Sequence, residues 1–345
     1  MAYTTIDKPT DYFNTKLYTG TGSAQSITGV GFSPEMSWFK QRNTTRGHVL
    51  EDIVRGAGKT LFPHDTSAET AGGYYLTSFD SDGFTLPSSN VGTNESSGTY
   101  VAWNWKAGGS ASSNTDGSIT STVSANTTAG FSIVSYTGTA SAGATVGHGL
   151  GVKPDMIITK ARAIADNWGV YHKSLGATKA LYLNSTNAEN TSSAFYNNTE
   201  PTSTLVTFGD NEATNDNDTM IMYAFAEKKG YSKFGSYTGN GNADGTFVYT
   251  GFKPAWVMIK KSSGTNEWGV WDNKRSTFNV TDDIIYANLS NAEAANNANG
   301  LDFVSNGFKI RASGDLFNAS SGSYIYMALA ESPFVTSTGI PTTAR

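Results

Sequence analysis

One short segment of the sequence has the residue types of a phosphate-binding loop. The run GAGKT, from Gly56 to Thr60, combines glycines with a lysine, and such loops hold phosphate oxygens with their backbone amides. The motif also requires a glycine three residues before Gly56, where Ile53 stands. A related run, GATKA from Gly176, occupies the same place in a second copy of the pattern described below. We therefore interpret Gly56 as part of a structural turn.

Two acidic segments have the oxygen ligands that calcium requires. One is the run DNEATNDND over 210–218, and the other is the pair Asp80 and Asp82. Neither has the spacing of a full calcium-binding loop with its terminal glutamate. We favour solvated hairpin loops, because Asn and Asp are common in turns, and we predict no metal site. Calcium at these loops stays open as the alternative.

The chain has four histidines, which are His48, His64, His148 and His172. Asn184 and Asn288 take the place of His64 in the other copies of the pattern, and Asp52 and Asp272 take the place of His172. Catalysis would need a base held by an orienting partner in one fixed geometry. The sequence therefore predicts polar surface positions, no catalytic residue and no cofactor.

Aromatic rings can stack on sugar faces, and the aromatic positions that could do so here are Trp168, Tyr171, Trp268 and Trp271. The loops Asn211 to Asn217 and Asn240 to Asp244 add amides and carboxylates that can hydrogen-bond hydroxyls. The predicted carbohydrate or receptor contacts are Trp168, Trp268, Asn211, Asn215, Asn240 and Asp244. The alternative is that the loops only turn the chain and that both tryptophans lie in cores.

The elements that carry these residues occur three times in the same order. The tripeptide YTG begins at Tyr18, Tyr136 and Tyr237, and a proline follows 16 to 18 residues later. Each proline opens an apolar run that ends in a lysine six residues on, in PEMSWFK, PDMIITK and PAWVMIK. Next come HVLED, WGVYH and WGVWD, a segment that closes on Ala-Glu, and an aromatic-rich strand. The third copy has about four extra residues within 273–283.

Apolar runs of 5 to 9 residues, broken by Gly, Asn and Asp, indicate strands. Asp82-Gly83 and Asn306-Gly307 lie between strand-like segments and predict hairpins. Helix is expected only over short stretches such as 67–71 and 291–296. The predicted fold class is all-β, with three tandem antiparallel β-sandwich modules.

The predicted domain boundaries follow the repeats. They are 1–107 for the first module with an N-terminal arm, 108–130 for a Gly/Ser/Thr-rich linker, 131–229 and 230–333 for the second and third modules, and 334–345 for a tail. The linker is expected to lie outside any core, because it is small and polar. The first module should therefore move relative to the other two.

Composition excludes several classes of protein. The net charge of −5 without clusters of Lys and Arg argues against a nucleic-acid partner. No apolar run is long enough for a membrane span, and the start of the chain does not have the pattern of an export signal. With 12% aromatic and 15% charged residues and no cysteine, part of each module is expected to pack against neighbours, so we predict a homo-oligomer.

Several segments also resemble modules of tailed bacteriophages of marine bacteria, including cyanophages. They are YSKFGSYTGNGNADGTFVYTGFKPAWVMIK over 231–260, GHGLGVKPDMIITKARAIADNWGVYH over 147–172, SFDSDGFTL over 78–86 and TYVAWNWKAGG over 99–109. The opening AYTTIDKPTDYFNTKLYTG is similar to the usual start of such chains. The resemblance covers nearly the whole chain.

The resemblance implies a jelly-roll or lectin-like sandwich in a virion appendage of tail-fibre, knob or head-decoration type. We expect a non-enzymatic virion structural protein, assembled in the host cytoplasm with other virion proteins and able to contact a host surface glycan or receptor. The alternatives are a capsid-decoration or connector protein without receptor contact and a polysaccharide depolymerase. The resemblance brings no catalytic residues, and His48 departs from the tryptophan of copies two and three.

Overall fold

Strands predominate in the computed structural model, which describes residues 4–88, 90, 92–295 and 299–333. The named strands of this part of the chain pair antiparallel throughout, so the predicted all-β class is confirmed. The named helical elements are single turns, η1 (Pro9–Asp11), α1 (Ser193–Tyr196), α2 (Glu212–Asn215) and α3 (Asp315–Asn318). The predicted tail, 334–345, lies outside the described residues.

Repeat 1, residues 12–107, contains a large sheet of order β1-β9-β3-β4, a small sheet of order β2-β8-β7 and the pair β5-β6. Its strands are β1 (Phe13–Thr19), β2 (Gln25–Thr28), β3 (Met36–Gln41), β4 (Val49–Asp52), β5 (Lys59–Thr60), β6 (Thr70–Ala71), β7 (Ser78–Asp80), β8 (Gly83–Leu86) and β9 (Thr99–Trp105).

Repeat 2, residues 131–229, has the same central order, β12-β19-β14-β15, in its large sheet. Strands β10 and β11 of the preceding segment extend this sheet to β10-β11-β12-β19-β14-β15-β16-β17, and β13 and β18 form the small pair. The strands are β10 (Ser112–Asn114), β11 (Ser121–Asn126), β12 (Phe131–Thr137), β13 (Thr145–Gly147), β14 (Met156–Ala161), β15 (Gly169–His172), β16 (Lys179–Tyr182), β17 (Asn190–Thr191), β18 (Leu205–Thr207) and β19 (Thr219–Phe225).

Repeat 3, residues 231–333, has the large sheet β20-β28-β22-β23-β24-β25 and the small sheet β21-β27-β26. Its strands are β20 (Ser232–Thr238), β21 (Phe247–Tyr249), β22 (Phe252–Lys261), β23 (Trp268–Asp272), β24 (Asp283–Tyr286), β25 (Ala294–Ala295), β26 (Leu301–Val304), β27 (Gly307–Ile310) and β28 (Ser323–Pro333). The helical turns expected over 67–71 and 291–296 are wrong in the described residues, where β6 and β25 stand instead.

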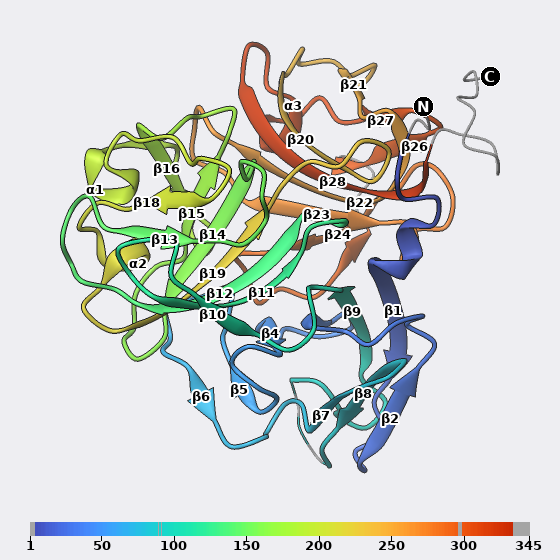
Figure 1. Cartoon of the computed structure of the whole chain (residues 1–345). Coiled ribbons are helices and arrows are strands. Elements are labelled where there is room, and N and C mark those ends of the chain that lie inside the picture. Colours follow the sequence, from blue (N-terminus) through green and yellow to red (C-terminus); the bar gives the residue numbers. More distant parts are fainter. Residues whose placement is uncertain (1–3, 89, 91, 296–298, 334–345) are drawn as a thin grey trace.

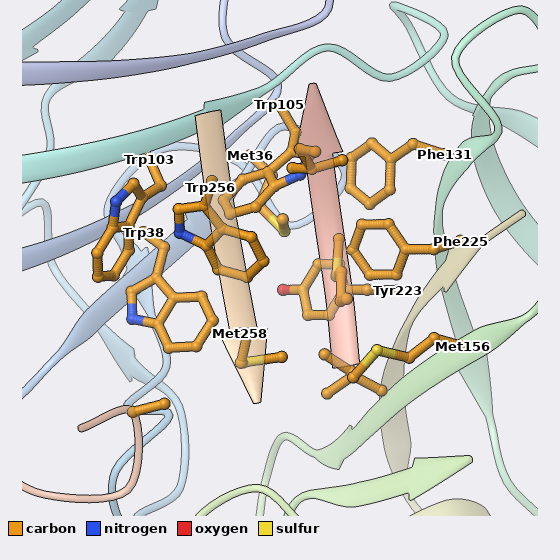
Figure 2. Packing of buried hydrophobic residues seen from close by; sticks show 14 of the residues in the cluster. Met36, Trp38, Trp103, Trp105, Phe131, Met156, Tyr223, Phe225, Trp256 and Met258 are labelled. Atoms are coloured by element: carbon orange, nitrogen blue, oxygen red, sulfur yellow. The ribbon is translucent and has the colours of Figure 1, made fainter. Parts of the chain in front are cut away.

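Each repeat has its own hydrophobic cluster, formed by residues of its large and small sheets. A fourth and larger cluster joins the other faces of the three large sheets. In Figure 1 the repeats form three lobes, from blue through green to red, around this centre. Figure 2 shows Trp38, Trp105, Tyr223 and Trp256 from all three repeats facing one another there. The three repeats therefore share one core.

This shared core explains the apolar runs that follow the prolines. All residues of β3 and of β14 are buried, because one face of each strand packs on the small sheet and the other on the shared core. Strands covered on both faces read as continuous apolar runs without alternation. The expected movement of the first repeat is therefore wrong, since it would expose Trp38 and Trp103, which are 3% and 0% exposed.

The segment 108–130 is not a linker outside the core. Strand β11 pairs with β12 over its whole length, and β10 pairs with β11. Val123 and Ile119 pack in the cluster of repeat 2. The alternation in STVSAN places Val123 inward, while Ser and Thr on the other face gave the segment its linker-like composition.

The two predicted hairpins are present, one residue from the expected place. Asp80 pairs with Gly83 and Val304 with Gly307, so the turns are 81–82 and 305–306. A Cβ on Gly83 would lie 1.8 Å from the carbonyl oxygen of Ile27, and one on Gly307 would lie 2.0 Å from that of Val248. These glycines are required by the close approach of a third strand.

Candidate binding site and contacts between the repeats

The two tryptophans predicted to contact a sugar are buried in the shared core. Trp168 is 0% and Trp268 is 1% exposed. Each indole donates a hydrogen bond of 3.0 Å to a backbone carbonyl of the preceding repeat, Trp168 to Phe62 and Trp268 to Tyr182. Both side chains therefore hold repeats together, and neither is available as a surface anchor.

Asn215 and Asn211, which lie in the predicted contact loop of repeat 2, also have structural contacts. The buried Asn215 amide donates to the carbonyls of Ser141 and Gly209 at 3.0 and 2.7 Å and accepts from Thr139. Asn94 and Asn318 make the matching contacts in the other repeats. Asn211 caps the turn α2 by accepting from the Ala213 amide. The acidic run is thus a capped turn with a buried side, which the loop prediction missed.

Asn240 and Asp244 are the two predicted contacts that lie on the surface. The Asn240 amide donates to the Asp244 carbonyl at 3.1 Å. The Asp244 carboxylate pairs with Lys309 at 2.5 Å, and hydrogen bonding by this lysine and its charge lower the pKa of Asp244. This loop stays available for contact.

At the interface of repeats 1 and 2 an aspartate–arginine pair is fully buried. Arg55 Nε donates to Asp52 Oδ2 at 2.5 Å, and the Tyr223 hydroxyl of repeat 2 donates to the same oxygen at 2.7 Å. Glu69 binds Arg55 at 3.1 Å and Arg162 of repeat 2 through two bonds of 2.9 Å. Burial raises the pKa of Glu69, but hydrogen bonding by Arg162 and the charge of Arg55 outweigh it and lower this pKa.

The interface of repeats 3 and 1 repeats this network. Arg275 Nε donates to Asp272 Oδ2 at 2.6 Å, and Trp103 of repeat 1 donates its indole N–H to the same oxygen at 3.0 Å. Glu293 binds Arg275 at 3.0 Å and Arg42 of repeat 1 at 2.7 and 2.9 Å. Repeat 1 therefore contacts repeat 2 and repeat 3 through the same kind of network. In both cases one repeat provides the Asp–Arg pair and the next repeat, in the order 1, 2, 3, 1, provides the hydrogen-bond donor.

At the interface of repeats 2 and 3, other residues take the places of the aspartate, the arginines and the donor, and the glutamate is kept. His172 stands for the aspartate, Leu175 for the arginine and Met327 for the donor of the next repeat. Ser262 stands where Arg42 and Arg162 stand elsewhere. Glu189 keeps its backbone hydrogen bond to Ser262, and its carboxylate pairs with Lys179 of its own repeat.

His172 fits this less charged interface as a neutral imidazole. Its Nδ1 accepts from the Ser174 amide at 3.2 Å, so Nε2 carries the proton and donates to the Tyr326 carbonyl at 3.1 Å. Burial lowers its pKa to about 4. The expectation of surface histidines is wrong for His48, His148 and His172, which are all 0% exposed.

His48 takes the place of Trp168 and Trp268 and makes the same kind of contact. Its Nδ1 accepts from the Trp38 indole at 2.8 Å, so Nε2 donates to the Tyr286 carbonyl at 3.0 Å. Burial lowers the pKa of His48 well below its ordinary value. Repeat 2 has Ile158 in the place of Trp38, so a large and a small side chain have exchanged positions.

A buried lysine closes each of the three apolar runs. Each ammonium donates to the carbonyl of the next residue, and burial lowers the pKa of each to about 8. The three are Lys40, Lys160 and Lys260. Lysines with a lowered pKa occur as catalytic groups. All three are 0% exposed, so we assign them to the structure.

A pocket of about 290 Å³ opens on repeat 1 beside His48 and is lined by Phe62, His64, Asp65 and Tyr75 among others. His64 Nδ1 accepts from the His48 amide at 3.0 Å, which is the role of Asn184 and Asn288 towards the tryptophans of their repeats. The sequence comparison marked the place of His64 as variable but did not reveal the pocket.

The acidic pair Asp80 and Asp82 is occupied by protein donors. Asp82 accepts from the amides of Gly29 and Gly31 at 3.0 and 2.6 Å, and Asp80 accepts from the Ser78 and Thr85 hydroxyls. The described residues contain no group of three or more His, Asp or Glu placed to share a metal ion. They also contain no helix with the length and apolarity to cross a membrane.

Fold and contacts together define an all-β protein in which three repeats of one unit close around a shared core. The chain belongs to the family described as Domain of unknown function (DUF7483), whose model matches residues 8–333. No curated protein and no solved structure matches the chain. The family match spans all three repeats, which agrees with their forming one structural unit.

Proposed function

We propose that the protein is a non-enzymatic structural protein of a bacteriophage virion, a tail or head appendage such as a fibre or knob that can contact the host surface. Each repeat is proposed to be a β-sandwich of the jelly-roll or lectin-like kind. The proposal rests on the resemblance of its segments to virion appendage modules and on the arrangement of the three repeats.

The observation that carries the proposal is the use of the polar groups between repeats. The pairs Asp52–Arg55 and Asp272–Arg275 each accept a hydrogen bond from the next repeat. His48 and His172 each donate to a carbonyl of another repeat. Catalysis needs polar groups that stay free to meet a substrate in one geometry. This favours a structural or binding role over the depolymerase alternative.

Two strand edges favour contact with other virion proteins or with further copies of the chain. In repeat 2 the outer edge of β12 is covered by β11. Among the described strands, the equivalent β1 pairs only with β9, and β20 only with β28. Open edges are where another chain can add a strand. This also suits the alternative, a capsid-decoration or connector protein without receptor contact.

Labelling the protein on intact particles in electron micrographs tests the proposal. A label at the tail tip or on fibres supports receptor contact, and a label spread evenly over the head supports decoration. Absence of the protein from purified particles would overturn the virion role.

A further inference from the structure

We propose that the pocket of repeat 1 beside His48 binds one ring of a neutral hexopyranose. The inference rests on the receptor-contact part of the proposed function and names its ligand class. Pockets for small molecules usually have about 300–1,000 Å³. At about 290 Å³ this pocket fits one small ring.

The pocket exists because small residues in repeat 1 replace larger ones. Gly47, which lines the pocket, stands where the other repeats have Asn167 and Glu267. A Cβ on Gly47 would lie 2.2 Å from the His64 ring. In repeat 2 the same space holds the Asn184 amide, which donates to Asn167 at 2.9 Å.

Gly92 is a second glycine that lines the pocket. It lies in the turn that corresponds to α2, since the Asn94 amide donates to the Asn90 carbonyl as the Asn215 amide donates to Asn211. Repeat 2 has Ala213 in its place. A Cβ on Gly92 would lie 2.7 Å from the Tyr75 ring. Both glycines therefore make room for a ring that lines the pocket.

Two aromatic side chains give the pocket an apolar wall. Phe62 and Tyr75 meet edge to face, with ring centres 5.7 Å apart. The Thr93 hydroxyl fixes Tyr75 through a bond of 2.7 Å to its carbonyl. Tyr75 is half-buried, so part of its ring is accessible. Rings of this kind pack against the C–H face of a sugar.

Donors and acceptors for hydroxyl groups lie beside this wall. His64 Nδ1 accepts a backbone hydrogen bond, so its Nε2 carries the proton, 3.4 Å from the Asp65 carboxylate. Asp65 accepts one bond from the Ser67 amide at 2.8 Å. A carboxylate has about four acceptor positions. Asp65 can therefore accept bonds from two neighbouring sugar hydroxyls.

The charges of the pocket favour a neutral sugar. Arg46 lies 3.7 Å from Glu95, which offsets its charge, and Asp65 adds a negative charge at the mouth. An acidic sugar would bring its carboxylate towards Asp65. Burial lowers the pKa of His64, the charge of Asp65 raises it and the charge of Lys40 lowers it again, and the net effect is a lowered pKa that disfavours the charged imidazolium.

Saturation-transfer NMR and calorimetry with the purified full chain test the inference. The probes are the methyl glycosides of glucose, galactose and mannose, N-acetylglucosamine, and glucuronate as the acidic comparison. We expect millimolar binding of at least one neutral probe. Tyr75→Ala and Asp65→Ala should each weaken it roughly tenfold or more, about 1.4 kcal/mol. The matched controls Tyr249→Ala, an exposed tyrosine of repeat 3, and Ser185→Ala, the place of Asp65 in repeat 2, should leave it unchanged.

A second variant, which copies two residues of repeat 2 into the pocket, tests sugar binding even if one of the single substitutions impairs folding. Gly47→Asn with His64→Asn restores the amide pair of Asn167 and Asn184 and should abolish binding while the protein stays folded. Binding that survives in this variant, tighter binding of glucuronate than of every neutral probe, or no binding to the wild type would each overturn the inference. Particle labelling is independent of this result, so failure of the virion role is distinguishable from failure of the sugar site.

Discussion

The interfaces of repeat 1 with its two neighbours contain buried charges, whereas the interface of repeats 2 and 3 contains a histidine, a leucine and a methionine at the same places. Aspartate, arginine and the donor of the next repeat occur together or are replaced together. A buried network with one member missing leaves an unpaired polar group, which costs more than an apolar replacement of the whole set. The comparison shows that these residues depend on one another across the interfaces.

The largest expected effect comes from breaking one network in part. Arg55→Leu should lower the free energy of unfolding by about 3–5 kcal/mol, because it leaves Asp52 buried without its charge partner. The triple variant Asp52→His, Arg55→Leu and Tyr223→Met copies His172, Leu175 and Met327 of the interface of repeats 2 and 3 and should recover most of the loss. Denaturant unfolding measures both.

The matched control for this experiment is Lys153→Leu, which removes a half-exposed pair with Glu200. It should cost less than about 1 kcal/mol, as surface pairs do. If the triple variant is no more stable than Arg55→Leu, the residues do not act as a set.

His172 gives the interface of repeats 2 and 3 a pH dependence of its own. Its pKa is about 4 in the folded chain, below the ordinary value of 6.5, so the unfolded chain binds the proton first as pH falls. The contribution is fully present above pH 6.5 and is lost as pH falls from 6.5 towards 4, up to roughly 3 kcal/mol. His172→Gln should reduce the slope of unfolding free energy against pH over this range. An unchanged slope would contradict the neutral buried imidazole.

Repeat 1 has Trp38 and His48 where repeat 2 has Ile158 and Trp168, and substitutions that restore the pattern of repeat 2 test whether the two positions depend on each other. His48→Trp alone should destabilise the protein by about 1–3 kcal/mol, because the space is already filled by Trp38. Adding Trp38→Ile restores the pattern of Ile158 and Trp168 and should recover most of this loss in thermal unfolding. Equal stability of the single and double variants would mean that the two positions are independent.

The smallest expected effect comes from adding a charge to the interface of repeats 2 and 3. Ser262→Arg places an arginine where Arg42 and Arg162 stand and offers Glu189 the same bidentate partner. The gain should be about 0.5 kcal/mol, because such partly exposed pairs contribute little. Ser262→Met, which adds bulk without charge, is the control, and a gain of equal size there would assign the effect to packing.

The sequence alone predicted the repeats, the all-β class and the hairpins, because strand runs and turn residues are local signals. It did not predict the shared core, although the continuous apolar run PEMSWFK is typical of a strand covered on both faces. The Ser/Thr-rich segment 108–130 has the composition of a linker, because Ile119 and Val123 are its large buried side chains and the other buried ones, Ser121, Ser124 and Ala129, are small.

The candidate site was harder to predict than the fold. Trp168 and Trp268 were candidate sugar contacts from residue type, but their partners Phe62 and Tyr182 lie about 90 to 110 residues away in the chain. The pocket on repeat 1 depends on Gly47 and Gly92, because a side chain at either position would collide with a ring that lines the pocket. The sequence shows that the repeats differ at Gly47 and Gly92, but it does not show that both glycines line the same pocket.

The closure of three repeats within one chain has a consequence for how the protein behaves on dilution. A ring of three separate subunits must form by collision, so its stability falls as the protein concentration falls. Here the three large sheets that bury Trp103, Tyr223 and Trp256 belong to one polypeptide. Closing this ring is an intramolecular step, and the midpoint of its unfolding is independent of concentration. The central core therefore persists in a single molecule at any dilution.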